Sequence, residues 1–449
     1  MAQERTTCCV VGGGPAGMIL GLLLARAGVE VTVLEKHADF LRDFRGDTVH
    51  TSTLTLLDEL GLWPRFEQLP YRALTKVRVR LDSGEVDFAD MTRLSEPHPM
   101  VAMVPQWHLL DMLAHAAGEE PTFTLRMSTE VTGLVRSGDR VAGVRLADRA
   151  EDGSLGPESV LAADLVVACD GRDSRLRADS ALPLYRYHVP LDVEWFRVPR
   201  REGDPEGGLG RVGRGRFMVF LDRGEYYQCA LIIGKGTDAR LRSGPVQGLR
   251  DVVAGMNPWM ADRLDAISSW DEVKLLEVTL DRLKRWSVPG LLCIGDAAHA
   301  MSPVGGVGIN LAIQDAVAAG RVLAGPLGAG DDAAVDRAAT SVQRRRTFPT
   351  VVTQTLQDLA HRRVVAPLLS AEATDHADTE VPFPIRLLER FPALQWLPAR
   401  LVGVGALPEH APAFARRPPM PVPGGASDAA LLAASDRKAA SSGEVSRPT

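Results

Sequence analysis

The sequence predicts an α/β protein with two different sheets, and three observations indicate it. An apolar, β-rich run at Thr7 to Val11 leads into a glycine turn, a helical pattern and a second strand, which together form a βαβ unit. Between residues 189 and 233 the pattern changes to strand-like runs separated by turn residues, which is typical of an antiparallel sheet. A fully apolar strand returns at Leu291 to Ile294. We therefore expect a parallel sheet built from non-contiguous segments, an inserted antiparallel sheet and C-terminal helices.

The first third of the chain supplies the βαβ unit and two further elements. The helical pattern runs from Pro15 to Ala27, and Gly28 is placed to end it. Val29 to Leu34 then reads as a strand that ends at Glu35. Thr51 to Leu60 is predicted to be an amphipathic helix, and Thr75 to Phe88 a hairpin around an Asp-Ser-Gly turn.

The next segments alternate between helix and strand. Gln106 to Ala117 is predicted to be helical, and Glu130 to Leu146 a second hairpin around a Ser-Gly-Asp turn. Ala163 to Cys169 is expected to be a buried strand that leads into Asp170.

In the middle of the chain, Val189 to Val198, Arg216 to Asp222 and Tyr226 to Ile233 are the expected strands, and residues 207–215 are expected to be a glycine- and arginine-rich loop. A helix follows Gly308. Residues 343–369 are predicted to be helical with interruptions at Pro349 and Pro367. Residues 417–449 have almost no large apolar side chains, and we expect a disordered tail there.

Composition and charge exclude several classes of function. A formal net charge of -6 over 449 residues gives no basic face for nucleic acid. The apolar run from Gly17 to Ala27 is too short to span a bilayer. The five cysteines match neither a zinc site nor a disulfide framework, so we expect no metal, and reduced, buried thiols in a cytoplasmic protein.

The glycine run after the first strand carries the dinucleotide fingerprint. Gly12 permits the tight turn, Gly14 lets the backbone approach a pyrophosphate, and Gly17 lets the helix pack on the strand. The helix N-terminus then faces the anion with free N–H groups. Glu35, at the end of the second strand, is placed to accept hydrogen bonds from ribose hydroxyls. This context predicts a Rossmann-like domain, but it leaves NAD and FAD open.

A second segment favours FAD. Gly295-Asp296 ends an apolar strand, so that Asp296 projects where a ribityl hydroxyl can donate to it. Pro303 and three glycines then lead into the helix that starts near Ile309. Such an entry presents bare N–H groups, which suit the anionic pyrimidine edge of a reduced flavin.

With Asp170-Gly171-x-x-Ser174-x-x-Arg177 between these two segments, the chain resembles the single-component (group A) FAD-dependent aromatic hydroxylases of the p-hydroxybenzoate hydroxylase fold, over about residues 6–345. The resemblance implies that the Asp170 segment lies beside both FAD and the nicotinamide approach, and that Pro303 lies near flavin and substrate. It also implies FAD contacts for Arg45 and for Gln106, at the start of a helix. His50 could face flavin or substrate, or it could be a capping or structural residue. His299 is expected to hydrogen-bond and pack the loop.

The expected site residues fall into two sets. We expect catalytic roles at Pro303, Gly305, Gly308 and His50. We expect the cofactor to contact Gly12, Gly14, Pro15, Ala16, Gly17, Glu35, Lys36, Arg45, Gln106, Asp170, Gly171, Arg177, Gly295, Asp296, Pro303, Gly306, Val307, Gly308 and Asn310.

These expectations give a division of the chain. Residues 1–74, 98–181 and 276–345 would form the FAD-binding domain, residues 75–97 and 182–275 the substrate-binding sheet domain, residues 346–416 the C-terminal helices, and residues 417–449 the tail.

The implied activity is that of an NAD(P)H-dependent monooxygenase. NADPH or NADH would reduce FAD, O2 would add at flavin C4a, and the resulting hydroperoxide would give one oxygen atom to an electron-rich aromatic or polycyclic substrate. We expect the protein to be a monomer or a homodimer.

Three alternatives keep the flavin. The first is an epoxidase or an oxidase/dehydrogenase on the same fold, and another is a non-catalytic flavin-binding protein. A halogenase is disfavoured because that family carries Trp-x-Trp-x-Ile-Pro, and no two of the seven tryptophans here are two residues apart.

Overall fold

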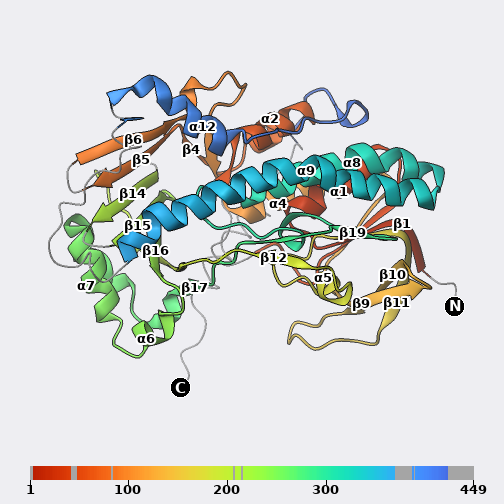
Figure 1. Cartoon of the computed structure of the whole chain (residues 1–449), viewed down its shortest axis with the longest axis horizontal. Helices are drawn as coiled ribbons and strands as arrows, with labels where there is room; N and C mark the ends of the chain where they lie inside the picture. The colour runs from red at the N-terminus through yellow and green to blue at the C-terminus, as the bar shows by residue number, and fades with distance from the viewer. Residues whose placement is uncertain are drawn as a thin grey trace.

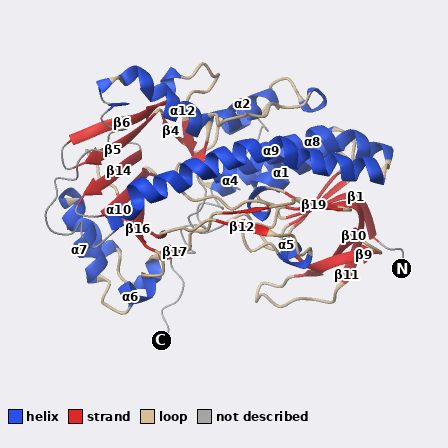
Figure 2. Cartoon of the chain, viewed as in Figure 1, coloured by secondary structure: helices blue, strands red, loops and turns tan. Residues whose placement is uncertain are grey.

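The computed structural model describes residues 4–41, 48–81, 84–205, 208–213, 216–369, 387–388 and 390–422. Two sheets lie at opposite ends of the molecule, and long helices run across one side of both (Figures 1 and 2). The predicted α/β fold with a parallel sheet is confirmed.

The first sheet has eight strands, and its central path runs β19-β20-β11-β1-β2-β8. Its strands β20, β11, β1, β2 and β8 are parallel to one another, and β19 pairs with β20 in the antiparallel direction. β9 and β10 form an antiparallel extension beside β11. The strands are β1 (Glu4–Val11), β2 (Val31–Leu34), β8 (Phe123–Arg126), β9 (Thr129–Ser137), β10 (Arg140–Asp148), β11 (Ser159–Ala168), β19 (Ser287–Val288) and β20 (Leu291–Cys293).

The second sheet has seven strands in the order β17-β13-β16-β15-β14-β5-β6. All of its pairs are antiparallel except β14 with β5. It unites the early hairpin with the middle of the chain, as the sequence indicated. The strands are β5 (Lys76–Leu81), β6 (Gly84–Asp90), β13 (Leu191–Pro199), β14 (Gly208–Gly213), β15 (Arg216–Asp222), β16 (Tyr226–Gly234) and β17 (Lys274–Leu276).

Two small sheets complete the strands. They pair β3 (Thr48–Val49) and β4 (Arg72–Leu74) with β7 (Val101–Met103), and β12 (Leu184–Arg186) with β18 (Asp281–Leu283). The helices are α1 (Pro15–Arg26), α2 (Thr51–Glu59), α3 (Trp63–Phe66), α4 (Gln106–Gly118), α5 (Arg175–Asp179), α6 (Asp238–Arg242), α7 (Gln247–Met256), α8 (Gly308–Ala329), α9 (Asp332–Ala360), α10 (Ala366–Leu369) and α12 (Trp396–Gly403). In the part of the chain that the structure describes, no helix is long and apolar enough to cross a membrane.

The helices α1, α8 and α9 pack side by side against the first sheet. α1 and α8 approach closely, since a Cβ on Gly320 would lie 3.1 Å from the Cβ of Leu23. α9 runs from the first sheet toward the second, and α10, which follows it, contacts β15 of the second sheet (Figures 1 and 2). A separate apolar cluster fills the space between the second sheet and the segment around Met301, Val307 and Leu311. The two sheets are therefore joined through the segment in which the sequence placed the flavin.

The interruption predicted at Pro349 is wrong. α9 continues without a break from Asp332 to Ala360, with Pro349 buried inside it. A proline in a helix interior costs about 3 kcal/mol, so packing must offset that cost. Its neighbour Arg346 is fully buried in an ion network. The proposed boundary between residues 345 and 346 also falls within this one helix.

The loop expected at residues 207–215 is instead largely strand. Residues 208–213 form β14, which pairs with β15 on one side and β5 on the other. Glycine weakens an isolated strand, but here neighbours on both edges supply hydrogen-bond partners. Residues 207, 214 and 215 lie outside the described residues.

The start of the expected tail is packed rather than disordered. The amide N of Met420 donates to the carbonyl of Gly61 at 2.8 Å, and Arg65 Nε donates to the carbonyl of Pro421 at 3.1 Å. Arg26, which is buried, lies 3.2 Å from the sulfur of Met420. Residues 417–422 are thus held in part by the buried side chains of Arg26 and Arg65, which composition could not reveal. The rest of the expected tail, residues 423–449, lies outside the described residues.

This packing predicts a difference between two truncations. A chain that ends at Val422 keeps the contacts with Gly61, Arg65 and Arg26, so its free energy of unfolding should match that of the full chain. A chain that ends at Arg416 loses them and should be about 1–3 kcal/mol less stable. Urea unfolding of both truncations measures the difference. Equal stability of the two would show that residues 417–422 contribute nothing.

Candidate active site

The predicted cofactor segments meet because they follow neighbouring parallel strands. Gly12 comes after β1, Glu35 after β2, Asp170 after β11 and Gly295 after β20. Parallel strands bring their carboxyl ends to the same edge of a sheet, where α/β proteins bind ligands. The four segments therefore lie along one edge.

The glycine turn is fixed by close contacts on one side and open on the other. Gly12 has φ 111°, and a Cβ there would lie 2.4 Å from the carbonyl O of Cys169. A Cβ on Gly17 would lie 1.9 Å from the carbonyl O of Gly12. In contrast, a Cβ on Gly14 would meet nothing within 4 Å. Pro15 is the first residue of α1, and Ala16 follows it. Gly14 thus fits a cradle for a pyrophosphate at the N-terminus of α1.

Glu35 supports the turn from the next strand. Its Oε2 accepts from the amide N of Gly13 at 2.9 Å, and its Oε1 accepts from the amide N of His37 at 3.1 Å. A carboxylate has about four lone-pair sites, and a contact of Glu35 with a ribose hydroxyl stays a prediction. Lys36, the next residue, is exposed.

The second and third motifs touch each other directly. Arg172 Nε is 3.1 Å from Asp296 Oδ2. Arg177 hydrogen-bonds the carbonyls of Arg172 and Ala297. Asp170 accepts from the amide N of Leu176 at 3.3 Å, its Oδ1 has no partner among the described residues, and burial raises its pKa. Gly171, which stands between Asp170 and Arg172, has φ 86°, a backbone conformation that favours glycine. Sequence reasoning missed Arg172, which joins the two motifs.

The glycine loop before α8 is held by the segment around His50. The carbonyl of Gly306 accepts from Thr48 Oγ1 at 3.1 Å and lies 3.0 Å from His50 Nε2. His50 Nδ1 lies 2.8 Å from the carbonyl O of Val402. His50 is 1% exposed, and burial lowers its pKa, against the effect of both carbonyls. Both ring nitrogens are occupied by main-chain carbonyls, which favours the structural role over contact with substrate.

The loop itself is a tight turn that delivers α8. The amide N of Gly306 donates to the carbonyl of Pro303 at 2.9 Å, and Gly305 and Gly306 have φ 84° and 64°. Val307 precedes the first residue of α8, Gly308. We propose that this loop and the free N–H groups of α8 border the flavin.

Asn310 adds a polar group in the first turn of α8. Its Oδ1 accepts from Ser52 Oγ at 2.9 Å and from Thr53 Oγ1 at 2.6 Å. Its Nδ2 is buried without a hydrogen-bond partner in the described structure. An unpaired buried amide is costly, so this group is a candidate donor to the cofactor. Ser52 and Thr53 were not predicted.

Like the other expected cofactor residues, Gln106 and Arg45 stay predictions. Gln106 is the first residue of α4, as expected of a residue at a helix start. Arg45 lies outside the described residues.

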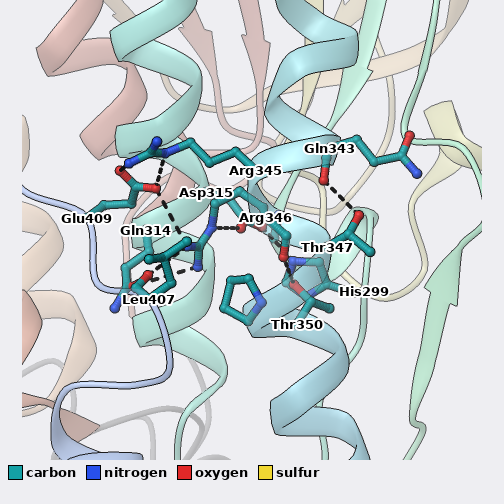
Figure 3. Close-up of polar contacts among 12 residues, drawn as sticks. His299, Gln314, Asp315, Gln343, Arg345, Arg346, Thr347, Thr350, Leu407 and Glu409 are labelled. Carbon is teal, nitrogen blue, oxygen red and sulfur yellow. Dashed lines mark hydrogen bonds and ion pairs between the residues drawn. The ribbon is translucent and has the colours of Figure 1, made fainter.

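A buried ion network holds Gly295 in place (Figure 3). Asp315 Oδ2 accepts from the amide N of Gly295 at 3.1 Å and lies 2.5 Å from His299 Nε2, while its Oδ1 accepts from Arg346 Nε at 2.9 Å. All three side chains are at most 1% exposed. Burial alone would raise the pKa of Asp315, but His299 and Arg346 outweigh it and lower the pKa. Beyond Arg346, Glu409 also binds Arg345 (Figure 3).

Sequence reasoning expected His299 to hold the loop, and its bond to Asp315 confirms this. It missed Asp315 and Arg346. The signal for Asp315 was present: a Gln-Asp pair stands inside the apolar run Leu311 to Ala319 of α8.

Comparison with known proteins identifies the family. Residues 5–355 match the family model described as an FAD-binding domain. The chain belongs to this family. It is 34% identical over 325 residues to 6-methylpretetramide 4-monooxygenase of Streptomyces rimosus, covering 71% of this chain and 75% of the relative. It is 26% identical over 346 residues to protoasukamycin 4-monooxygenase of Streptomyces nodosus subsp. asukaensis, covering 74% and 83% of the two chains.

Solved structures share the fold. The p-nitrophenol 4-monooxygenase of Pseudomonas putida superimposes with a TM-score of 0.68 at 18% identity, covering 89% of this chain and 97% of that one. The p-hydroxybenzoate hydroxylase fold, the cofactor FAD and the activity class, an FAD-dependent NAD(P)H monooxygenase, are therefore established for this flavoprotein.

The open space at Gly14 predicts that a larger side chain there abolishes FAD binding without unfolding the protein. With φ −74°, Gly14 has a backbone that valine can adopt. Gly14→Val should therefore leave the melting temperature of the apoprotein unchanged but block the pyrophosphate. FAD content after reconstitution measures this. Gly12→Val is the contrasting variant, since its side chain collides with Cys169 and should destabilise the apoprotein itself. Full FAD occupancy in Gly14→Val would refute the placement.

The Asp315 network predicts a large stability effect. Asp315→Asn removes the carboxylate that both His299 and Arg346 contact, and among the described residues it leaves Arg346 only the longer ion pair with Glu409 at 3.7 Å. Breaking the buried pair of Asp315 with Arg346 should cost about 3–5 kcal/mol in unfolding free energy. Asp336→Asn is the control, because Asp336 pairs with Arg140 at side-chain exposures of 31% and 22% and should cost about 0–1 kcal/mol.

The difference in unfolding free energy between Asp315→Asn and Asp336→Asn should hold from about pH 5 to pH 8. A carboxylate with a lowered folded pKa contributes fully above its unfolded pKa and loses that contribution only as pH falls through the folded value. Chemical unfolding of both variants across this range measures it. Similar costs for the two variants would contradict the role of Asp315.

Proposed function

We propose that this monooxygenase hydroxylates a polycyclic aromatic substrate. The observation that carries the proposal is the apolar layer between the second sheet and residues 303–308, which we call the flavin loop. Leu191 and Val193 of β13 and Val278 share one buried cluster with Met301 and Val307. These side chains bury one another and form an apolar wall behind the loop, and such a wall suits a flat hydrophobic substrate beside it. The named activities of two Streptomyces rimosus relatives, toward 6-methylpretetramide and anhydrotetracycline, support this class.

The reaction consumes NADH or NADPH, a proton, O2 and the aromatic substrate. It yields the oxidised nicotinamide, the hydroxylated product and water. FAD, when bound, supplies the redox chemistry that links the nicotinamide to O2. The overall balance places one oxygen atom of O2 in the product and the other in water.

The chain's own residues hold the loop in position, favour negative charge beside it and exclude water from it. The N–H groups at the start of α8 favour negative charge beside them, because the helix dipole is positive at that end. The apolar side chains of Met301, Val307 and Leu311 keep water from the adjoining space. In this proposal Pro303, Gly305 and Gly308 act through loop shape, and His50 through its hold on Gly306.

We further propose a cytoplasmic location, because all five cysteines are unpaired. The proposed assembly is a monomer or a homodimer.

Oxygen labelling tests the reaction. The purified holoenzyme is supplied with NADPH or NADH, 6-methylpretetramide and isotopically labelled O2. One labelled atom should enter the product and the other should appear in water, as followed by mass spectrometry. In the absence of substrate, nicotinamide oxidation should be slow or should release hydrogen peroxide.

Product structure decides among the related chemistries. A labelled hydroxyl on the ring supports hydroxylation, whereas a labelled epoxide would replace it with the epoxidase alternative. An oxidised product that carries no label would refute oxygen insertion and leave an oxidase or dehydrogenase. Anhydrotetracycline serves as a second polycyclic probe, and p-nitrophenol as a single-ring comparison.

A further inference from the structure

One face of α9 carries a stripe of buried polar side chains that continues past the end of the helix. Successive members are separated by four, four, three and four residues, which is the spacing of one helix face. Each is at most 4% exposed. The members are Arg346, Thr350, Gln354, Gln357 and His361.

Most of this stripe binds the segment that leads into the flavin loop. Arg346 holds Asp315, which in turn holds Gly295. Gln354 Nε2 donates to the carbonyl of Ala300 at 3.3 Å and to that of Asp281 at 2.7 Å. Residues later in α9 therefore contact residues later in this segment.

Gln357 makes three hydrogen bonds around Pro303. Its Oε1 accepts from the amide N of Ser302 at 3.1 Å. Its Nε2 donates to the carbonyls of Ser302 at 2.9 Å and Val304 at 2.8 Å. One side chain thus fixes the main chain on both sides of the proline.

His361 completes the hold at a π-helical turn. Its Nε2 lies 2.8 Å from Ser302 Oγ, which itself accepts from the amide N of Val304 at 3.3 Å. The π-helix spans His361 to Val365, and such turns inside α-helices frequently mark functional sites. Val365 belongs to the same apolar cluster as Met301 and Val307.

We propose that Gln357 is a positioning residue that sets the electrostatics of the flavin loop. Its amide turns the carbonyl oxygens of Ser302 and Val304 toward α9. A carbonyl oxygen turned toward the cofactor would oppose the negative charge of a reduced flavin. The inference rests on the proposed placement of the flavin at this loop, but it does not depend on the substrate or on oxygen insertion.

The test compares three variants by FAD binding and by the midpoint potential of bound FAD. Gln357→Met keeps the shape of the side chain and removes all three hydrogen bonds. Thr350→Val is the matched control, because Thr350 Oγ1 is fully buried and bonds only the helix's own Arg346 carbonyl at 2.7 Å. Gly306→Ala reports on the loop directly, since φ is 64° and its Cβ would lie 2.8 Å from Thr48 Oγ1.

Gln357→Met should weaken FAD binding about tenfold, which corresponds to 1.4 kcal/mol, and should make the midpoint potential more negative. Thr350→Val should lower the melting temperature without moving either flavin property. If Gly306→Ala changes the potential and Gln357→Met does not, the positioning role is overturned. If neither changes it, the placement of the flavin at the loop is overturned, and the inference falls with it.

Gln357→Glu supplies a second measurement that does not require an apolar residue in this polar stripe. An ionised carboxylate can accept from Ser302 but cannot donate to either carbonyl, whereas a protonated one can donate once. FAD affinity of this variant should therefore rise as pH falls, and that of Gln357→Met should not follow it. Affinity equal to that of the wild type at pH 8 would overturn the requirement for donation.

Discussion

The site depends on one buried carboxylate, that of Asp315. Its two oxygens bind an amide N at the end of β20, a histidine of the same motif and an arginine of α9. A buried charge is tolerated only when it is paired and hydrogen-bonded. Each of the three partners is therefore needed by the other two. The Gly295 motif and the C-terminal helix cannot reach their places independently.

This constraint explains why the C-terminal region belongs to the cofactor site. Arg346 passes the network on to the carbonyl of Leu407 and to Glu409, and Glu59 of α2 binds Arg416 at 2.9 Å. Contacts between segments that are hundreds of residues apart, such as that of Glu59 with Arg416, thereby hold the C-terminal region against the rest of the chain. The flavin loop is in turn held from two directions, by His50 on one side and by Gln357 on the other. In the proposed function, the protein contributes this rigidity to the chemistry, together with the helix N-terminus and the apolar layer beside it.

Much of the fold could be predicted because its signals are local. The turn at Gly12 requires a positive φ, and the close approach of Gly17 to Gly12 excludes any side chain. Such demands are met by the residue type itself and are visible in a single sequence. The ends of four apolar strands can likewise be predicted from the local sequence, and they lie at Val11, Leu34, Ala168 and Cys293. Parallel pairing of these strands then brings the motifs together.

The sequence by itself therefore determined the parallel sheet, the order of its motifs and the kind of cofactor. The tertiary structure decided what the local pattern misjudged. Pro349 stays within a helix because burial of Arg346 and its neighbours outweighs the local cost, and residues 208–213 become a strand because both edges find partners. It also decided which buried polar groups meet: Gln357 and Ser302 are 55 residues apart in the chain. The strength of such a contact depends on desolvation and geometry at the meeting point, and neither is written in the local sequence.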